Sequence, residues 1–588
     1  MSPRSTLTVE ILGKLRSIDN FKYPELIEFL LRNRGIKKSE FNNFLNPDLS
    51  KVTAKNVGIN LAELEKSSKR IKDAIKKKEK IVVFGDYDVD GICGSAILWE
   101  TLKDAGGDVL PYIPNRFEEG YGLSKNAISN LKSQIPDVTL VITIDNGIVS
   151  GDGVDFAKES GIDVIVTDHH VPGNSLPAAF SIVHTTRLCG AGVAYLLAQN
   201  IKSQISKSKS SDDNHLELVC LATIADLVPL TGANRTLVSL GIKKLRETKR
   251  PGLLELFKEA EIEKSEIHTY EIGHIIAPRL NAMGRMEDAM DSLRLLCTNN
   301  SQRAKELAKK LGDTNRIRQT LTIDTFYHAK AQVDEKTKNK LLFVHHDSYP
   351  EGIIGLVAGR LTEEYYLPSI VISKGKKISK ASARSISGFN IIEFIRNASE
   401  FLVDAGGHPM AAGFTFETKN LNKVEKKFQE LAGKAIKKEL LLRKRKIDCE
   451  IALESLSLEF YNEISKLEPF GMGNPTPVFL SRDVEILDMW WVGSEKNHLK
   501  LKFQVENFQI EGIWFGIGQT DLFRIGDRAS IVYSLSLNEW NGAKKVELRL
   551  KNLILENIIA SSQRLLGKKG YTLGKQILQY SMIIHLQA

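Results

Sequence analysis

The sequence predicts an α/β protein with a parallel-sheet domain, a smaller α/β domain joined to it by a long helix, and a C-terminal all-β domain. Three observations predict this class. Apolar runs alternate with helical patterns in the first half of the chain, a similar alternation resumes near residue 340, and strand-like alternation replaces it beyond about residue 480. Because 588 residues exceed what one hydrophobic core usually organises, we expect several domains.

Three apolar runs predict the parallel sheet. They are IVVFG at residues 81–85, VTLVITI at 138–144 and IDVIVT at 162–167. A helix predicted over residues 61–80 ends in a lysine-rich turn, which suits the negative end of a helix dipole, and leads into the first run. Helical patterns separate the runs, so we expect βαβ units and a sheet that is buried on both faces.

The middle of the chain predicts a connection and a second α/β domain. Residues 201–214 are polar and repetitive, which predicts an exposed loop. Residues 301–330 carry a continuous helical pattern that would bridge two domains. The second α/β pattern begins with KLLFVHH at 340–346 and includes LPSIVIS at 367–373.

The C-terminal region has the periodicity of β-strands. Apolar and polar residues alternate over residues 499–505 and again over 546–551. The pair Asn541-Gly542 precedes the second run and is typical of a tight hairpin. Residues 480–558 therefore predict a small antiparallel barrel or sandwich, and the tail from residue 559 is weakly informative.

Composition favours a soluble protein of a reducing cytoplasm. Apolar residues make up 42% of the chain and charged residues 26%, and no stretch approaches the ~20 continuous apolar residues of a membrane span. The N-terminus lacks the apolar centre of a signal peptide, and the five cysteines include no C-x-x-C pair. The net charge of +9 permits a polyanionic partner without requiring one.

Acidic and imidazole side chains follow the apolar runs. The carboxyl ends of parallel strands meet at one edge of a sheet, where ligands bind. A fourth apolar run, LATIADLVPL, adds one further acid. The residues expected at this edge are Asp86, Asp88, Asp90, Asp145, Asp168, His169, His170 and Asp226.

Three other interpretations of these acids are an EF-hand calcium loop, a phosphate-binding loop and helix capping. An EF-hand loop that began at Asp86 would need a glutamate at its twelfth position, where this chain has Ile97. A phosphate-binding loop is unsuitable because the segment is acidic and lacks the G-K-[ST] ending. A single acid such as Asp145 is more often a helix cap than a ligand, and Asp168 is expected to orient His169. Acids on successive strand ends make a purely structural explanation improbable.

Divalent metal ions explain this crowding of charge. Five or six carboxylates at one edge would raise one another's pKa values unless cations neutralised them. Oxygen-rich ligation with one or two imidazoles suits Mg²⁺ or Mn²⁺, and the number of acids is enough for a pair of ions. Such a pair stabilises in-line displacement at phosphorus, so the sequence predicts hydrolysis of a phosphoester or phosphoanhydride.

Four motifs resemble those of the DHH phosphoesterase superfamily: DYDVDG, TIDNGI, TDHH and TIADLVPL. Further segments resemble the RecJ family of bacterial single-strand-specific exonucleases within that superfamily. They are LLRNRGI, RFEEGYGL, APRLNAMGRMEDA, AGGHPMAAGFT and PFGMGNPTPVF, and the similarity covers nearly the whole chain.

The resemblance implies a role for each motif residue. Asp88, Asp90, Asp145, His169 and Asp226 would ligate two Mn²⁺ or Mg²⁺ ions, with Asp86 completing or supporting that shell. His170 would contact the scissile phosphate, and Gly406, Gly407 and His408 would hold the terminal nucleotide. Arg279, Asn281 and Arg285, in a segment expected to be a loop, would contact the DNA backbone. Arg116, Tyr121 and Arg384 are weaker candidates for the same role, with surface salt bridges as the alternative for the arginines.

The resemblance also implies the domain organisation. We expect an N-terminal helical region at residues 1–60, a DHH domain at 61–300, a connecting helix at 301–335, a DHH-associated domain at 336–440, an OB-fold at 441–558 and a tail at 559–588. An OB-fold binds single strands through basic grooves and aromatic stacking. The available tryptophans are Trp490, Trp491, Trp514 and Trp540, most of them expected in the core.

Two segments depart from the family's usual pattern. The stretch SIVHTTRLCGAGVAYLL lacks the Asn-Pro and Pro-Phe that the family usually has there. Tyr349-Pro350-Glu351-Gly352 stands where the family usually has Trp-His-x-Gly, which removes a histidine from the second domain. None of the four metal motifs is affected.

The function implied is 5′-to-3′ exonucleolytic hydrolysis of single-stranded DNA in recombination and repair. The expected protein is a cytoplasmic monomer, with a helicase and a single-strand-binding protein as partners. Two alternatives remain: a phosphodiesterase of the same superfamily that acts on short oligonucleotides or cyclic dinucleotides, and a non-catalytic DNA-binding replisome scaffold.

Overall fold

The computed structural model describes residues 7–12, 23–116, 119–120, 122–205, 215–334, 339–518, 523–540 and 542–555. The chain divides into two compact units. The first unit comprises Ser39–Gln319 and Glu468–Pro475, and the second comprises Met1–Lys38, Thr320–Leu467 and Thr476–Ala588. None of the described helices combines the length and the apolar character that a membrane span requires.

A five-stranded parallel sheet organises the first unit. Its order is β3-β2-β4-β5-β6. The three predicted runs form β2, β4 and β5, and two further strands extend the sheet at its edges. The bounds are β2 Lys80–Gly85, β3 Asp108–Tyr112, β4 Val138–Ile144, β5 Asp163–Asp168 and β6 Ser181–His184.

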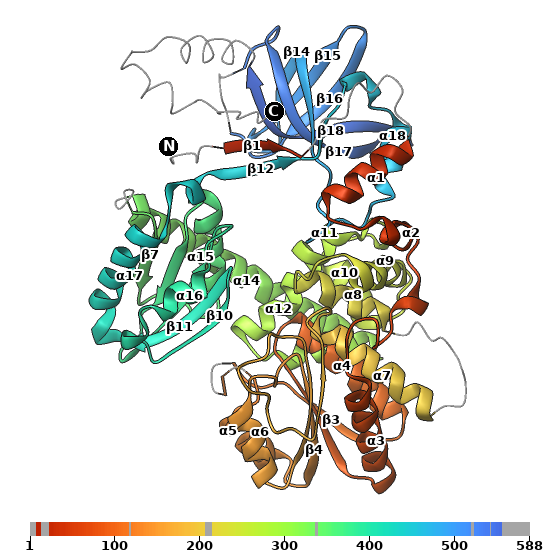
Figure 1. Ribbon diagram of the computed structural model, residues 1–588, viewed down its shortest axis with the longest axis vertical. Coiled ribbons are helices and arrows are strands. Elements are labelled where there is room, and N and C mark those ends of the chain that lie inside the picture. Colours follow the sequence, from red (N-terminus) through yellow and green to blue (C-terminus); the bar gives the residue numbers. More distant parts are fainter. Residues whose placement is uncertain are drawn as a thin grey trace. The chain divides into compact units, whose positions relative to one another are not determined.

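Helices cover both faces of this sheet, as the buried apolar runs predict (Figure 1). Ile81, Val83 and Ile142 pack on one face against α3, α4 and α7, while Val82 and Phe84 pack on the other against α5 and α6. The helices are α2 Phe41–Leu45, α3 Leu61–Lys77, α4 Val89–Asp104, α5 Lys125–Gln134, α6 Gly151–Glu159, α7 Gly190–Ile205, α8 Leu216–Ala225, α9 Gly232–Arg246, α10 Pro251–Glu259, α11 Thr269–Glu271, α12 Ala277–Met286 and α13 Met290–Cys297.

The sequence predicts two loops in the first unit, and the structure differs from each of these predictions. Residues 201–205 continue α7, and residues 206–214 lie outside the described residues. The segment around Arg279 is helical, because a short π-helix at Ile272–Ile276 leads directly into α12. Pro278 is compatible with this geometry because it occupies the first turn of α12.

The expected connecting helix is present as α14, Ser301–Asp334, which runs from the first unit into the second. A five-stranded mixed sheet of order β10-β11-β9-β8-β7 follows it. One face packs against α15 and the end of α14, and the other against α16 and α17. The bounds are β7 Leu342–His346, α15 Ile354–Tyr365, β8 Ser369–Ser373, β9 Ile378–Arg384, α16 Ile391–Arg396, β10 Asp404–His408, β11 Ala411–Glu417 and α17 Leu421–Ala435.

The C-terminal strands close into a five-stranded barrel, because β14 pairs with both β15 and β17. The predicted hairpin joins β17 to β18, although Asn541 itself lies outside the described residues. The barrel is not wholly antiparallel, since β16 and β18 pair in parallel. The bounds are β12 Arg443–Ile447, β13 Cys449–Glu450, α18 Leu458–Ser465, β14 Phe479–Val492, β15 His498–Val505, β16 Phe508–Trp514, β17 Arg528–Trp540 and β18 Ala543–Leu555.

The N-terminal region is not wholly helical. Strand β1, Leu7–Ile11, pairs in parallel with β12, and α1, Tyr23–Asn33, packs against α18. A chain segment that is remote in sequence supplies the partner strand, which is why local patterns alone do not reveal β1.

The expectation that most tryptophans lie in the core is wrong for the described side chains. Trp490, Trp491 and Trp514 are all half-buried rather than buried. The Lys500 ammonium lies over the ring of Trp490, 5.8 Å from its centre, and makes a cation–π contact. Trp514 stacks with Phe523 at a ring separation of 5.9 Å. The side chain of Trp540 lies outside the described residues.

Candidate metal centre

Acids and imidazoles converge at the carboxyl edge of the parallel sheet. Strands β2, β4 and β5 are neighbours and end at this edge, so their following residues meet. Asp226 comes from the C-terminal end of helix α8 instead of a strand. The carboxylate and imidazole atoms form three groups that each lie within 4.8 Å: Asp86, Asp88 and Asp145; Asp90, His169 and Asp226; and Asp145, His169 and His170.

Local capping explains the order of residues in the first motif. Asp88 is the N-cap of α4, and its Oδ1 accepts hydrogen bonds from the amides of Asp90 and Gly91. A Cβ at Gly91 would lie 2.5 Å from the backbone nitrogen of Asp86. Glycine at this position therefore lets α4 begin directly against the end of β2.

Asp145 has a left-handed backbone, with φ of 62°. Few residues other than glycine adopt this conformation, although aspartate tolerates it better than most. A Cβ at Gly190 would lie 2.6 Å from the Cβ of Asp145, so only glycine fits as the first residue of α7 without a shift. Strain of this kind often occurs at functional sites.

Asp90 is held by the N-terminus of α7. Its Oδ2 accepts a hydrogen bond of 2.6 Å from the amide of Gly190, and its Oδ1 accepts one of 2.7 Å from Ala191. The positive end of the helix dipole lies here and stabilises the carboxylate. His169 Nε2 lies 3.7 Å from Asp90 Oδ2 and 3.0 Å from Asp145 Oδ1.

Asp168 orients His170 rather than the expected His169 ring. Its Oδ1 accepts hydrogen bonds from the His170 ring Nδ1 at 2.8 Å and from the backbone amides of His169 and His170. Its Oδ2 accepts a hydrogen bond of 2.9 Å from the amide of Ile148. Both oxygens of Asp168 are thus occupied by protein donors, as are those of Asp90, and this distinguishes the two from Asp86 and Asp145.

The pKa values reflect this crowding. Burial, followed by repulsion from neighbouring aspartates, raises the pKa values of Asp86, Asp88 and Asp145 above the ordinary range. The same two causes raise the pKa of Asp226 to about 8. These acids resist ionising together unless positive charge is added.

The two histidines differ in protonation. Burial lowers the pKa of His169, which favours the neutral imidazole that metals bind. Burial also opposes protonation of His170, but its hydrogen bond to Asp168 and the surrounding carboxylates outweigh burial and raise its pKa to about 9. His170 is therefore the cationic member of the pair at neutral pH.

The donor set fits divalent cations. Among the described residues, no hydrogen bond reaches the buried Oδ1 of Asp86 or the buried Oδ1 of Asp145, although His169 Nε2 lies 3.0 Å from the latter. Unpaired buried carboxylate oxygens are costly, and a hard cation such as Mn²⁺ or Mg²⁺ would satisfy them. Asp145 belongs to two of the three groups, so it is placed between two potential ion positions.

The first unit places two of its candidate DNA contacts near the metal motifs. The Arg116 guanidinium lies 5.1 Å from the ring centre of Tyr87, and its charge also acts on Asp86. The charge of Arg285 acts on Asp88. Tyr121 lies outside the described residues.

The other two candidates of this unit have internal contacts. Arg279 donates to Glu259 at 2.7 Å and to the carbonyl of Ile275 at 2.9 Å, so its guanidinium lies in an internal ion pair. Asn281 Oδ1 accepts a hydrogen bond of 3.0 Å from the amide of Val89, which ties α12 to the start of α4. Asn281 thus supports the metal motif through the backbone.

The second unit carries the remaining candidates. Arg384 is half-buried, donates to Ser382 Oγ and to the carbonyl of Ala383 on its own strand, and has no carboxylate partner among the described residues. A Cβ at Gly355, in the first turn of α15, would lie 3.0 Å from its Nη2. A guanidinium without a carboxylate, next to the positive end of a helix, favours an anionic ligand.

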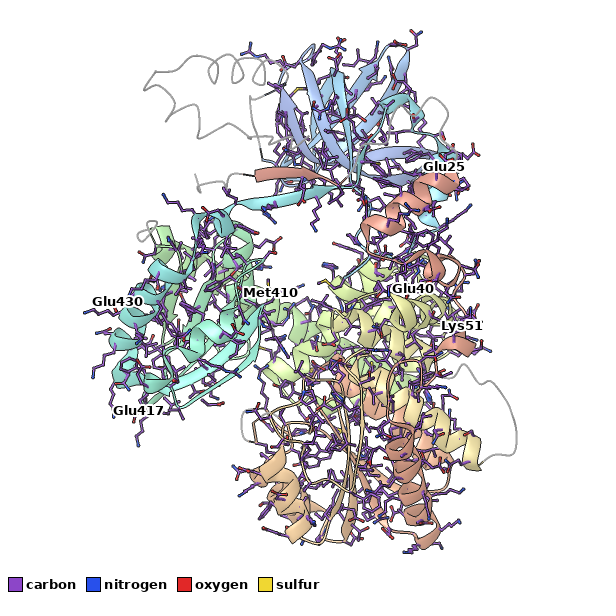
Figure 2. The ribbon with its side chains drawn as sticks, viewed as in Figure 1. Glu25, Glu40, Lys51, Met410, Glu417 and Glu430 are labelled. Carbon is purple, nitrogen blue, oxygen red and sulfur yellow. The ribbon has the colours of Figure 1, made fainter. Side chains whose placement is uncertain are left out.

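Gly406, Gly407 and His408 lie on β10, the edge strand of its sheet, and are exposed. Gly407 has φ of 139°, and a Cβ there would lie 2.5 Å from the carbonyl oxygen of Ala411. Met410, in the turn to β11, is 50% exposed (Figure 2). This hairpin presents backbone and imidazole groups on an open edge.

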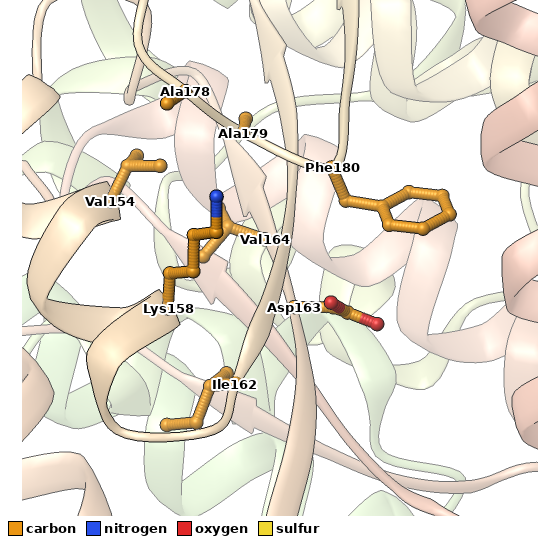
Figure 3. Close-up of a pocket in the computed structure, with 8 residues that line it drawn as sticks. All are labelled: Val154, Lys158, Ile162, Asp163, Val164, Ala178, Ala179 and Phe180. Carbon is orange, nitrogen blue, oxygen red and sulfur yellow. The ribbon is translucent and has the colours of Figure 1, made fainter.

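A small pocket of about 170 Å³ lies elsewhere on the first unit (Figure 3). It is at the opposite end of β5 from Asp168, because Asp163, which lines it, begins that strand. Asp163 also pairs with Arg70 at 2.7 Å. The pocket is separate from the metal centre and contains none of its acids. Its lining residues are Val154, Lys158, Ile162, Asp163, Val164, Ala178, Ala179 and Phe180.

Sequence reasoning missed several supporting groups. The amides of Gly190 and Ala191 and the ring of His184 hold the metal motifs in place, and so does the amide oxygen of Asn281, which was expected to contact DNA instead. The glycines of the LCGAGVA segment were one available signal, since glycine often marks close backbone approach. Nothing in the sequence indicated His184.

Family models match three parts of the chain. The DHH family N-terminal domain matches residues 80–223, the DHHA1 domain matches 338–434, and the RecJ OB domain matches 447–552. The same order of an α/β unit, a second α/β sheet and a barrel is seen in the structure.

Curated relatives match along most of the chain. The single-stranded-DNA-specific exonuclease RecJ of Bacillus subtilis is 36% identical over 502 residues, which is 83% of this chain but only 63% of the relative's length. RecJ of Haemophilus influenzae is 30% identical over 560 residues, which is 89% of this chain and 95% of the relative.

Solved structures of RecJ are also similar to this chain. The crystal structure of RecJ from Thermus thermophilus in complex with Mn²⁺ has a TM-score of 0.78 and 27% identity, covering 93% of this chain and 79% of that chain. The Mg²⁺ complex of the same protein has a TM-score of 0.74 and 25% identity, covering 93% and 78%. Together with the domain matches, the relatives show that the chain belongs to the RecJ family.

Proposed function

We propose that this chain is a metal-dependent exonuclease that hydrolyses single-stranded DNA from its 5′ end. One observation carries the proposal: six carboxylates and two imidazoles share one sheet edge, and two of the carboxylate oxygens are buried without a hydrogen bond from the described residues. The residues that would hold two Mn²⁺ or Mg²⁺ ions are Asp86, Asp88, Asp90, Asp145, His169 and Asp226. Such ions supply Lewis-acid stabilisation of a phosphate and make water nucleophilic at neutral pH.

The protein's own groups would position the substrate phosphate. His170 carries its positive charge at the metal centre because Asp168 binds its Nδ1, and its Nε2 would contact a phosphate oxygen. A fixed cationic donor stabilises charge that develops in the transition state. Arg116 and Arg285 are proposed contacts to the DNA backbone close to the same motifs.

Arg384 and the β10 hairpin are the proposed contacts of the second unit. The absence of a carboxylate beside Arg384 among the described residues supports binding of a phosphate group. Gly406, Gly407 and His408 would contact the terminal nucleotide at the open strand edge. Since the substrate is single-stranded, we expect partners of two classes, a helicase and a protein that coats single strands, and action in the cytoplasm.

End-labelled oligonucleotides test the activity and its polarity. With Mn²⁺, a 5′-labelled single strand should release labelled mononucleotide at once, while a 3′-labelled strand should shorten progressively. EDTA should stop both reactions. Release of the 3′ label first would contradict the polarity, and faster turnover of cyclic dinucleotides than of oligonucleotides would favour the small-molecule phosphodiesterase.

Asp145→Ala separates catalysis from a scaffold role. Cleavage should fall by at least ~1,000-fold, a loss on the order of 4 kcal/mol of transition-state stabilisation, while DNA affinity in the absence of metal should stay within about twofold. Asp152→Ala is the matched control, because Asp152 is an exposed acid on α6. Equal loss of binding and cleavage would favour a structural role for the site.

A further inference from the structure

The His169–His170 dipeptide follows β5 at the point where the strand ladder stops. Strands β5 and β6 pair as far as Asp168 and His184. Beyond this register, the backbone of residues 169–170 has no strand partner in the described sheet and needs other hydrogen bonds to hold it. Its orientation matters because it carries both imidazoles of the metal centre.

Asp168 holds the amide side of this dipeptide. Its Oδ1 accepts from the amides of His169 and His170 at 2.7 and 3.1 Å. The same oxygen accepts from the His170 ring. These contacts hold the two backbone nitrogen atoms, whereas the carbonyl of His170 needs a donor, which a carboxylate oxygen cannot be.

His184 holds the carbonyl side. Its ring Nε2 lies 2.7 Å from the carbonyl oxygen of His170. A carbonyl oxygen only accepts, so Nε2 of His184 must carry the hydrogen and donate it. The ring is half-buried at the end of β6, directly across the ladder from Asp168. The dipeptide is therefore clamped between a carboxylate and an imidazole on neighbouring strands.

We propose that His184 is a positioning residue, whose Nε2–H bond to the carbonyl of His170 sets the orientation of both motif imidazoles. The inference rests on the proposed function for its catalytic readout. This role requires a hydrogen-bond donor at the position of Nε2 and does not require an imidazole ring as such. Groups that orient metal ligands from behind typically contribute about 10- to 100-fold to metal affinity or activity.

Three substitutions of His184 test whether its donated hydrogen bond is the property that matters. His184→Gln places an amide nitrogen at about the reach of Nε2, whereas His184→Asn places one nearer the position of Nδ1, and His184→Ala removes the donor. We expect kcat to fall about 10- to 100-fold in the Ala and Asn variants and to recover to within about threefold of wild type in the Gln variant. KM for a single-stranded oligonucleotide should change by less than about threefold, because His184 is proposed to orient and not to bind DNA.

Mn²⁺ affinity supplies a readout that does not depend on DNA cleavage. Calorimetric titration of the DNA-free protein should show the same order, with wild type and Gln binding about tenfold or more tightly than Asn and Ala. This order remains testable if the chain proves not to be an exonuclease. His274→Ala is the matched control, because the His274 ring also contacts a backbone carbonyl, that of Tyr270 at 3.2 Å, but at an exposed site.

Two results would overturn the proposal. One is wild-type kcat and Mn²⁺ affinity in His184→Ala. The other is equal loss in the Ala, Asn and Gln variants, which would mean that the shape of the imidazole and not its donated hydrogen bond is required. If the Ala variant does not fold, the comparison of Gln with Asn decides the question alone.

Discussion

At the scale of single residues, neighbouring aspartates have different functions because their hydrogen-bond partners differ. Asp168 receives donors on both oxygens, while Asp145 keeps one buried oxygen that accepts no hydrogen bond from the described residues. The former is suited to orienting His170 and the latter to binding a cation. Residue type alone does not separate them, since both are acids at the end of a buried strand.

Replacing Asp168 should change how His170 titrates. In the metal-free wild type we expect the pKa of His170 to be about 9, because the Asp168 carboxylate and the nearby acids outweigh burial. In Asp168→Asn the neutral amide no longer attracts the proton, so the pKa should fall by at least about one unit. NMR titration of ¹³C-labelled histidine in EDTA measures both values, with His170→Gln assigning the signal. An unchanged titration in Asp168→Asn would contradict the role given to Asp168.

Asp226 should make the metal-free protein less stable as pH rises. Burial, and then repulsion from Asp90 and Asp88, raise its folded pKa to about 8, above the ordinary 3.8. Between these values the unfolded chain binds fewer protons than the folded one, so the free energy of unfolding falls with increasing pH. Relative to Asp226→Asn, the wild type in EDTA should lose a few degrees of Tm from about pH 5 to about pH 8.

Manganese should reverse this trend, because ion binding requires the ionised carboxylates. Thermal scans of wild type and Asp226→Asn in EDTA and in Mn²⁺ measure the difference at each pH. A wild-type Tm that rises relative to the variant with pH in EDTA would be inconsistent with the raised pKa.

At the scale of elements, helix α7 is as important as the strands. Its first two amides bind Asp90, and its first residue must be glycine to fit against Asp145. Asn281 on α12 also joins this helix to α4, because its side-chain oxygen accepts a hydrogen bond from the backbone amide of Val89. The metal centre is thus a junction of helix N-termini with strand ends.

Gly190→Ala should damage the junction without removing any polar group. The new methyl would lie 2.6 Å from the Cβ of Asp145, so α7 or Asp145 must shift. We expect about 1–3 kcal/mol of destabilisation from overpacking and at least about a tenfold loss of activity. Urea unfolding and oligonucleotide cleavage measure the two effects.

Gly359→Ala is the matched control for this substitution. Gly359 lies inside α15, and a Cβ there meets nothing within 4 Å. The change should be neutral or stabilise by up to about 1 kcal/mol, since alanine favours the helix. Similar losses in both variants would show that close packing at Gly190 is not the cause.

At the scale of the whole molecule, one unit assembles the entire proposed metal set. All of its acids and imidazoles come from residues 86–226, within the first unit. The chain crosses between the units at residues 38–39, 319–320, 467–468 and 475–476. Arg235 holds the returning segment in the first unit through bonds to the carbonyls of Phe44 and Glu468.

Manganese should therefore protect the first unit selectively. At about 100 times its Kd, one bound ion stabilises the state that binds it by about 2.7 kcal/mol. Hydrogen exchange should slow in peptides that contain β2, β4, β5 and the end of α8, and stay unchanged in the barrel strands β14–β18. Asp145→Ala should abolish the effect. Equal protection of the barrel would refute a metal set confined to one unit.

Local patterns in the sequence are enough to predict the fold class and the place of the site. Apolar runs of strand length identify β2, β4 and β5, and parallel strands must end at one edge, so the convergence of Asp86, Asp145 and His169 follows from local patterns and topology. The predicted hairpin between β17 and β18 follows in the same way from a local turn signal.

The role of each group around that edge depends on contacts that form only in the folded chain. The assignment of Asp168 to His170, the ion pair of Arg279 with Glu259, the parallel pairing of β16 with β18 and the bond from His184 all join residues through three-dimensional contacts. A periodic pattern records which face of an element is buried. It does not record which donor meets which acceptor, because those partners are chosen by packing between distant segments.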